Sequence, residues 1–272
     1  MKRIVLTLIM CFLGLLGTKA QTTITINKDG SNTTIYTDQH YPVWTSSSFQ
    51  YSVSQMIYTE SQLKEANNNT APSGNITDLA FVIKDDNTVT DTTRTWRIYI
   101  KSTNKDVFAD ESDWVTMNAA DKYFEGKVKL PTNGDVNIKL DKNFKYTGGN
   151  IVICVCEDGG IYYYAAYFKR FTAKANRSLT QRGSAKFNIA SLPSASTSYR
   201  TYSPIIKFTI VPPPPFNLNV NVTTDGTSPM QGVSVNVTGK DSGGSAVQEE
   251  GSTAADGTCT FVDLNEPDED CY

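Results

Sequence analysis

The run Ile151-Val152-Ile153-Cys154-Val155-Cys156 decides the fold class of this chain. All six residues are apolar, so a strand built from them presents apolar side chains to both faces of a sheet. Turn sequences flank the run, with Gly148-Gly149-Asn150 before it and Asp158-Gly159-Gly160 after it. A short apolar run between turns is typical of a buried central strand, as in a β-sandwich.

The segments on either side of this run alternate between apolar and polar residues, which is the period of a half-buried strand. The only helix signal is Thr59 to Ala66, where Thr59 and Gln62 have the spacing of a capping box. We therefore predict an all-β fold, an antiparallel β-sandwich of the jelly-roll kind. The apolar positions of the alternating segments are Leu79, Phe81 and Ile83; Trp96, Ile98 and Ile100; Phe124, Val128 and Leu130; Val136, Ile138 and Leu140; Ile206, Phe208 and Ile210.

The composition agrees with a β fold. Hydrophobic residues make up 39% and charged residues 19% of the 272 residues, compared with typical values of roughly 45–50% and 25%. Ser, Thr and Asn are abundant, and there are 14 Tyr and 12 Phe. β-Branched and aromatic residues suit a pleated, half-buried surface, so a helical bundle or a disordered tail fits poorly.

Residues 1–20 have the features of a secretory signal peptide. Lys2 and Arg3 precede an apolar run, and Thr18-Lys19-Ala20 supplies small residues before a cleavage point. The apolar run from Ile4 to Leu16 is shorter than the ~20 residues of a membrane span. We predict that the protein is exported, to the medium or to the outer cell surface, and that it has no transmembrane segment.

Four consecutive prolines, residues 212–215, divide the mature chain into residues 21–211 and residues 216–272. Such a run favours a stiff polyproline spacer. Residues 21–211 carry a net charge of +3, whereas residues 212–272 carry −9. Neither part has the dense basic stripe that binding to a phosphate backbone requires, so nucleic acid is not an expected partner.

The segment after the prolines predicts a second, smaller β-domain. Its 57 residues are fewer than the ~70–80 at which a single core is comfortably stable. We expect an immunoglobulin-like or transthyretin-like sandwich that is either truncated at Tyr272 or minimal, and further C-terminal domains could be linked to it in the native protein. The apolar positions are Phe216, Leu218, Val220 and Val222; Val233, Val235 and Val237; and Phe261 after the turn at Asp256-Gly257.

The first domain resembles a β-sandwich module of secreted, adhesin-like surface proteins of Bacteroidetes. The resemblance implies an exported binding or accessory module, without an assigned chemistry. Its motifs are Tyr41-Pro42-Val43, Phe49-Gln50-Tyr51 through Thr59, Gly74-Asn75-Ile76-Thr77, Arg94-Thr95-Trp96, Asp113-Trp114, Ser198-Tyr199-Arg200 and Pro204-Ile205-Ile206.

The second domain is similar to carboxypeptidase-regulatory-like domains, which are small transthyretin-like sandwiches. The matching stretches are Ser228-Pro229-Met230-Gln231-Gly232-Val233 and Asp256-Gly257-Thr258-Cys259-Thr260-Phe261. In that family a Gly-Tyr and a further strand usually follow, where this chain has Asp270-Cys271-Tyr272.

Catalytic motifs are missing from the sequence. The single histidine, His40, lies in a polar stretch, and there is no Gly-x-Ser-x-Gly, His-Glu-x-x-His or phosphate-binding loop. A pair of carboxylates for glycoside hydrolysis stays open, because any two acids could converge in the fold. We expect that the protein is not an enzyme.

Two groups of residues are candidate binding sites. Tyr162, Tyr163, Tyr164 and Tyr167 could form an aromatic surface for sugar stacking or protein contact. The acidic residues Asp85, Asp86 and Asp91 could hold Ca²⁺, because hard oxygen ligands cluster there. We expect no other cofactor.

The cysteines fall into two kinds. Cys154 and Cys156 alternate onto one face of a strand, where buried thiols are expected. Cys259 and Cys271 are candidates for a disulfide in an oxidising compartment.

Together these features predict a non-catalytic adhesion or glycan-binding accessory protein whose partner is a glycan or a host or cell-surface protein. The alternative is that the chain is an N-terminal spacer fragment of a larger secreted peptidase or glycoside hydrolase.

Overall fold

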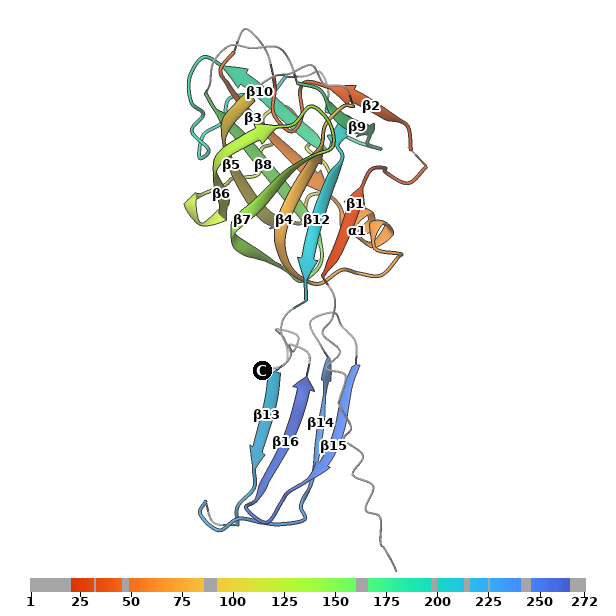
Figure 1. The fold of residues 1–272 in the computed structure, drawn as a ribbon, viewed down its shortest axis with the longest axis vertical. Coiled ribbons are helices and arrows are strands. Elements are labelled where there is room, and N and C mark those ends of the chain that lie inside the picture. Colours follow the sequence, from red (N-terminus) through yellow and green to blue (C-terminus); the bar gives the residue numbers. More distant parts are fainter. Residues whose placement is uncertain are drawn as a thin grey trace, which may run out of the picture.

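The computed structural model describes residues 21–31, 33–45, 49–85, 92–159, 166–196, 200–212, 216–224, 226–240 and 246–264. The fold is all-β, with antiparallel pairing between all the neighbouring strands named below (Figure 1). A four-stranded sheet contains, in spatial order, β1 (Thr22–Ile26), β12 (Ile206–Val211), β4 (Gly74–Val82) and β7 (Asp135–Tyr146). A five-stranded sheet contains, in spatial order, β10 (Ser178–Gly183), β3 (Tyr51–Tyr58), β8 (Asn150–Asp158), β5 (Thr92–Thr103) and β6 (Lys122–Leu130).

Eight of these strands are connected as a jelly roll. Taken in chain order, β1, β3, β4, β5, β6, β7, β8 and β12 pair from the outside inward: β1 with β12, β3 with β8, β4 with β7, and β5 with β6. This nested antiparallel pairing of two packed sheets is the jelly-roll pattern. Both the all-β prediction and the jelly-roll prediction are confirmed.

The two sheets face each other across one large core. Trp96, Phe81 and Phe208 are fully buried there, and the Phe81 ring lies edge-on to Trp96 at 6.3 Å between centroids. Every predicted alternating segment of residues 21–211 forms a strand whose apolar positions pack in this core, although Phe124 is only partly buried and Ile83 follows the end of β4 as an isolated bridge. Removing apolar surface from water stabilises the folded state by about 25 cal/mol per Å². This burial is the main contribution to the stability of the sandwich.

Strand β8 is central, as the apolar run predicts. Ile151, Ile153 and Val155 point into the core, whereas Val152, Cys154 and Cys156 point to the other face of the five-stranded sheet. That outer face is covered in turn by a second apolar cluster from the segments that follow β5 and β10. Its covering side chains include Phe108, Trp114, Met117, Phe187 and Leu192.

A short helix, α1 (Glu60–Ala66), follows β3 directly. The Thr59 hydroxyl accepts a hydrogen bond from the Gln62 backbone N–H at 3.4 Å, and the Gln62 side chain accepts one from the Thr59 N–H at 2.9 Å. This reciprocal bonding satisfies two of the amides that a helix start leaves open. The predicted capping box is therefore confirmed. A 3₁₀ turn, η1 (Ala119–Asp121), precedes β6.

A third sheet of three short strands lies at one end of the sandwich. Its order is β11 (Tyr202–Pro204), β9 (Phe168–Thr172) and β2 (Ile35–Asp38), so β2 is an edge strand. Phe168 and Phe171 of β9 are fully buried in the main core, which ties this sheet to the sandwich.

Residues 216–264 form two separate strand pairs. Strand β13 (Phe216–Asn221) pairs with β16 (Thr258–Leu264), and β14 (Ser234–Lys240) pairs with β15 (Ala246–Ser252). The apolar cluster of this smaller region contains three buried residues, Cys259, Phe261 and Leu264. Strand β15 has no apolar alternation. Its Gly251 lets the Cys259 thiol pack against the β15 backbone, because a Cβ at this position would lie 2.6 Å from the sulfur.

Candidate binding surface

Tyr167 projects from the large sandwich just before β9. This residue is 39% exposed, whereas the next residue, Phe168, is fully buried near Trp96. The buried Phe168 side chain fixes the backbone on one side of Tyr167. The Tyr167 carbonyl oxygen accepts a hydrogen bond from the Lys84 N–H at 2.8 Å. Tyr167 is therefore held out toward solvent by the backbone on both sides of it.

One ammonium group lies near the ring, and an ion pair lies on residues close to Lys84 and Tyr167 along the chain. The Lys84 Nζ lies 5.7 Å from the Tyr167 ring centroid, and the Lys169 Nζ lies 2.8 Å from the Asp85 Oδ2. We call Tyr167, Lys84, Lys169 and Asp85 the Tyr167 patch. An exposed aromatic face beside ammonium and carboxylate groups can stack on a sugar ring and hydrogen-bond its hydroxyls.

The other members of the predicted aromatic surface, Tyr162, Tyr163 and Tyr164, lie outside the described residues. The same holds for Asp86 and Asp91 of the predicted calcium site. Asp85 pairs with Lys169, and within the described ranges no three His, Cys, Asp or Glu side chains gather as metal ligands would. The calcium site stays a prediction.

Arg170 forms a second aromatic and cationic arrangement on the three-stranded sheet. Its guanidinium carbon lies 3.4 Å from the Tyr202 ring centroid and 5.0 Å from that of Tyr36. Tyr36 and Arg170 are direct partners across β2 and β9. The stack holds the Tyr36 ring in place although this ring is 46% exposed. Guanidinium groups favour such positions over aromatic faces.

The end of β8 carries two carboxylates that point to opposite faces of the sheet. On the outer face, Asp158 receives two hydrogen bonds from Arg97, one of them at 2.8 Å, and an ion pair from Lys186 at 2.9 Å. Burial acts to raise the pKa of Asp158, but the bonds from Arg97 and Lys186 outweigh it and lower that pKa. Arg97 also donates to the Tyr99 hydroxyl at 2.7 Å.

On the inner face, Glu157 and Arg94 form a buried ion pair. The Arg94 Nε lies 3.2 Å from the Glu157 Oε1, and the two side chains are only 4% and 6% exposed. Burial raises the pKa of Glu157 to about 7, and Arg94 offsets only part of this. Burial also lowers the pKa of Arg94. A buried pair of this kind pays a large desolvation cost for each charge.

These pairs were missed by the sequence reasoning, although a signal existed. Arg94 has the same strand phase as Trp96 and Ile98, and Glu157 has the same phase as Ile153 and Val155. A charged residue at a core-facing position indicates a buried pair.

The described cysteines are all buried. Burial raises the pKa of the Cys154 thiol well above its ordinary value, so little reactive thiolate forms there. Cys259 lies in the apolar cluster of the smaller region. Cys271 lies outside the described residues, so a disulfide between these two stays a prediction.

His40 packs against an aromatic ring. Its imidazole lies edge-on to Trp44 with 4.6 Å between ring centroids, and Arg182 lies over the same Trp44 ring at 4.3 Å. The His40 carbonyl oxygen accepts a hydrogen bond from the Thr180 hydroxyl at 3.3 Å. These contacts give the side chain a packing role.

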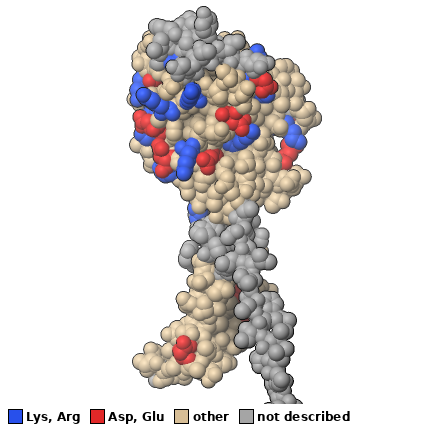
Figure 2. Space-filling view, in the orientation of Figure 1, with Lys and Arg blue, Asp and Glu red and all other residues tan. Residues whose placement is uncertain are grey.

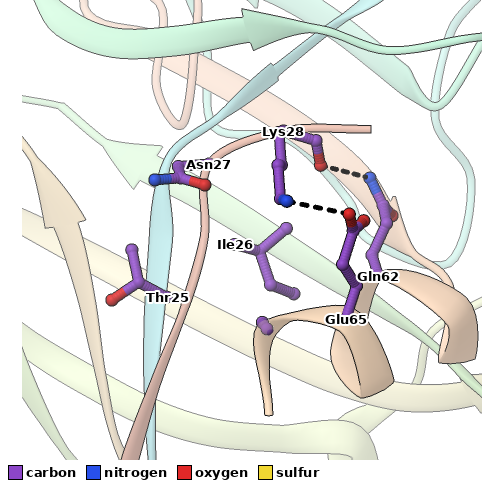
Figure 3. A pocket seen from close by; sticks show the side chains of 7 residues that line it. Thr25, Ile26, Asn27, Lys28, Gln62 and Glu65 are labelled. Carbon is purple, nitrogen blue, oxygen red and sulfur yellow. Dashed lines mark hydrogen bonds and ion pairs between the residues drawn. The ribbon is translucent and has the colours of Figure 1, made fainter. Parts of the chain in front are cut away.

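A shallow pocket lies between β1 and α1 (Figure 3). It has room for about one water molecule. The Lys28 ammonium pairs with Glu65 at 2.8 Å across it, and the Gln62 side-chain amide donates to the Lys28 carbonyl oxygen. The pocket is too small for a substrate, and its polar groups bond to one another.

We call residues 21–211 the larger region. On the face shown in Figure 2, charged side chains of both signs are interspersed over this region. Among the described residues, no helix is long and apolar enough to cross a membrane.

No family model and no curated protein matches this chain. Two solved structures show a low similarity to this chain. One is a clostridial cysteine protease after propeptide cleavage, with a TM-score of 0.36 and 10% identity over 69% of this chain and 39% of the protease. The chain thus spans about two fifths of the protease's length. The other is the group B streptococcus pilus 2b backbone protein, with a TM-score of 0.21 and 12% identity over 86% of this chain and 80% of that one. Neither likeness bears on function, since both TM-scores are below 0.5.

Proposed function

We propose that this chain is an exported, non-catalytic binding protein of the cell surface or the surrounding medium, an accessory module for adhesion that recognises glycans. The observation that carries this proposal is the Tyr167 patch. There the fold leaves Tyr167 39% exposed with the Lys84 ammonium 5.7 Å from its ring, and the Lys169–Asp85 ion pair lies on residues close to these two along the chain. We expect a ligand sugar to stack on Tyr167 and to receive hydrogen bonds from Lys84 and Lys169.

The proposal also includes the domain assignments and export. Residues 216–272, which include the smaller region, would be a transthyretin-like spacer of the carboxypeptidase-regulatory-like kind, joined through the 212–215 proline segment. Its strand pairs support this reading, because two short antiparallel pairs packed on a small apolar cluster form part of such a sandwich. Cleavage after residue 20 would release the mature chain.

An array of neutral and acidic oligosaccharides tests the binding function. The mature full chain should bind a subset of the array, and Tyr167→Ala should weaken that binding by roughly tenfold, because the variant loses an aromatic contact of about 1 kcal/mol together with the apolar area that the ligand buries on the ring. Val107→Ala is the matched control, since Val107 is also 39% exposed. Binding that is equal in the wild type and in Tyr167→Ala would remove the patch from the proposal.

Catalysis is tested on the same preparation. The chain should leave casein, gelatin and the bound oligosaccharides intact during prolonged incubation. Cleavage of any of them that survives repurification would overturn the non-catalytic part of the proposal.

A further inference from the structure

Strand β2 differs from the other edges of the large sandwich. It exposes two adjacent apolar side chains, Ile35 at 47% and Tyr36 at 46%. Neighbouring residues of a strand point to opposite faces. Strand β2 therefore exposes apolar surface on both faces of its sheet at once.

The other edges of this region are covered or polar or, in β11, contain a proline, Pro204. Strand β1 buries Ile24 and Ile26 and exposes threonines. Strand β10 receives a backbone hydrogen bond from the Ser196 N–H to the Thr180 carbonyl oxygen at 2.8 Å. Strands β6 and β7 lie beside each other and carry exposed lysines, which discourage strand addition. The edge at β2 has no lysine, proline or bulge.

The chemistry of β2 suits pairing with another strand. The stretch Thr33-Thr34-Ile35-Tyr36-Thr37 is uncharged and made of β-branched and aromatic residues, which are the best strand formers. A ligand docked on one face of the sheet would cover only one of the two exposed apolar side chains. An added strand covers both, because its own side chains alternate between the faces.

We propose that β2 is a self-association edge, and that the occupant is β2 of a second copy of this chain, paired antiparallel about a twofold axis. A twofold axis perpendicular to a sheet brings two identical edge strands together antiparallel. The stretch carries no charge, and the one charged residue of β2, Asp38, stands at its end, so two copies meet along the stretch without directly opposed charges. The result is one continuous six-stranded sheet made from two three-stranded ones.

The alternation of side chains between the two faces of the sheet restricts the register of this pair. Directly opposed residues must lie on the same face of the sheet, so in a twofold pair a central residue opposes its own copy. Centring on Tyr36 pairs the two Tyr36 rings and places Ile35 opposite Thr37 of the second copy. Each Tyr36 ring is already braced by Arg170, whose guanidinium carbon lies 5.0 Å from its centroid. The rings are thus positioned to meet before association, which lowers the ordering cost.

The expected affinity is low, because a four-residue strand buries much less than the ~1,000 Å² of a stable interface. Sedimentation velocity of the mature full chain from about 5 µM to about 500 µM should show a monomer–dimer equilibrium that ends at the dimer. Tyr36→Lys should weaken the dimer by roughly tenfold or more, because it places two ammonium groups opposite each other. Thr23→Lys, on the exposed part of β1, is the matched control and should dimerise like the wild type.

The register has its own test. Ile35→Cys and Thr37→Cys chains, mixed and oxidised, should give a disulfide-linked dimer, since the two positions oppose each other across the axis. Each variant alone should give much less of it.

A wild-type chain that remains monomeric at the highest concentration would overturn the proposal and leave β2 to a strand from another protein. A dimer that Tyr36→Lys leaves intact would overturn it as well, by placing the interface elsewhere. Glycan binding through the Tyr167 patch does not depend on either result.

Discussion

The larger and the smaller region are built from the same kind of antiparallel strand, but their cores differ greatly. The sandwich of the larger region contains 31 buried residues in one cluster, whereas the strand pairs of residues 216–264 bury three. In the smaller region Leu218, Val220 and Val235 face the cluster and are only partly buried. Its strands are formed, but little apolar surface is removed from water.

This difference shows that strand formation and domain stability are separate properties. A two-stranded ribbon is at best marginally stable by itself, and additional strands with a shared apolar face supply the rest. The larger region has that support on both faces of its five-stranded sheet. We therefore expect the two regions to unfold separately, the smaller one first, and the following four changes test this expectation.

The largest effect is expected in the main core. Phe208 is fully buried on β12, with its ring 5.9 Å from that of Tyr58. Phe208→Ala should destabilise the larger region by about 3–5 kcal/mol through lost burial and a cavity. All three tryptophans, Trp44, Trp96 and Trp114, belong to this region, so tryptophan fluorescence in a urea titration reports on it alone.

Phe261→Ala in the smaller region is the counterpart. It should leave the fluorescence transition of the larger region unchanged. An equal shift of that transition by both variants would mean that the two regions unfold as one unit.

The second effect concerns the dependence of stability on pH. The pKa of Glu157 is about 7 in the folded protein, compared with an ordinary value of 4.5. The folded state therefore holds this proton more tightly than the unfolded state. The stabilisation that the Glu157 proton gives the folded state is complete below pH 4.5, falls as the pH rises towards 7, and is lost above pH 7. The full change is at most about 3 kcal/mol.

Urea midpoints followed by tryptophan fluorescence between pH 5 and pH 8 should therefore fall with increasing pH in the wild type. Glu157→Gln should flatten this slope, because the titrating group is gone. Asp110→Asn, at an exposed acid, should keep it. A slope that survives in Glu157→Gln would assign the dependence to another group.

The third effect tests the packing of the smaller region. A Cβ at Gly251 would lie 2.6 Å from the Cys259 sulfur and 3.2 Å from the Phe261 ring. Gly251→Ala should therefore cost about 1–3 kcal/mol by overpacking. The loss should appear in the lower of two calorimetric transitions only.

Gly239→Ala is the matched control, because a Cβ there meets nothing within 4 Å. It should leave the lower transition in place. If Gly251→Ala instead shifts the upper transition, the smaller region contributes to the stability of the sandwich.

The smallest effect is expected at the start of α1. Thr59→Ala removes the side-chain half of the capping box and should destabilise the larger region by about 1 kcal/mol. Thr70→Ala, at an exposed threonine after the helix, should change the urea midpoint by much less. Equal midpoints for Thr59→Ala and the wild type would show that tertiary packing alone holds the helix.

Most of the main sandwich follows from the sequence, because its strands alternate cleanly or, as in β8, are apolar throughout. Strand β3 hides this signal, since Ser52, Ser54 and Gln55 are fully buried in it. Their polar groups are satisfied inside the protein: Ser54 bonds to Thr180 at 2.9 Å, and Gln55 bonds to the Val115 backbone at 2.8 Å. Buried polar residues that find partners far along the chain cannot be recognised by period alone.

The candidate site was only partly predictable for a related reason. Tyr167 stands out in the sequence as part of an aromatic stretch. Its partner Lys84 is 83 positions earlier and comes close only because Ile83 forms a bridge with Phe168 at the start of β9. Likewise, Ile35 and Tyr36 are exposed because β2 is an edge strand of the third sheet. The place of short strands such as β2 and β11 in a sheet is set by their pairing with β9, which lies far away in the sequence.

The two arginine–carboxylate pairs on β5 and β8 have a consequence for how the sheet is assembled. Glu157 lies on the inner face with Arg94, and Asp158 lies on the outer face with Arg97. Shifting β5 by one residue against β8 would turn Arg97 into the core and Trp96 out of it, and would break both pairs at once. The pairs therefore favour one register of the central strands: in the alignment of β5 with β8 described here each arginine meets a carboxylate on its own face of the sheet, and a one-residue shift would leave these charges without their partners.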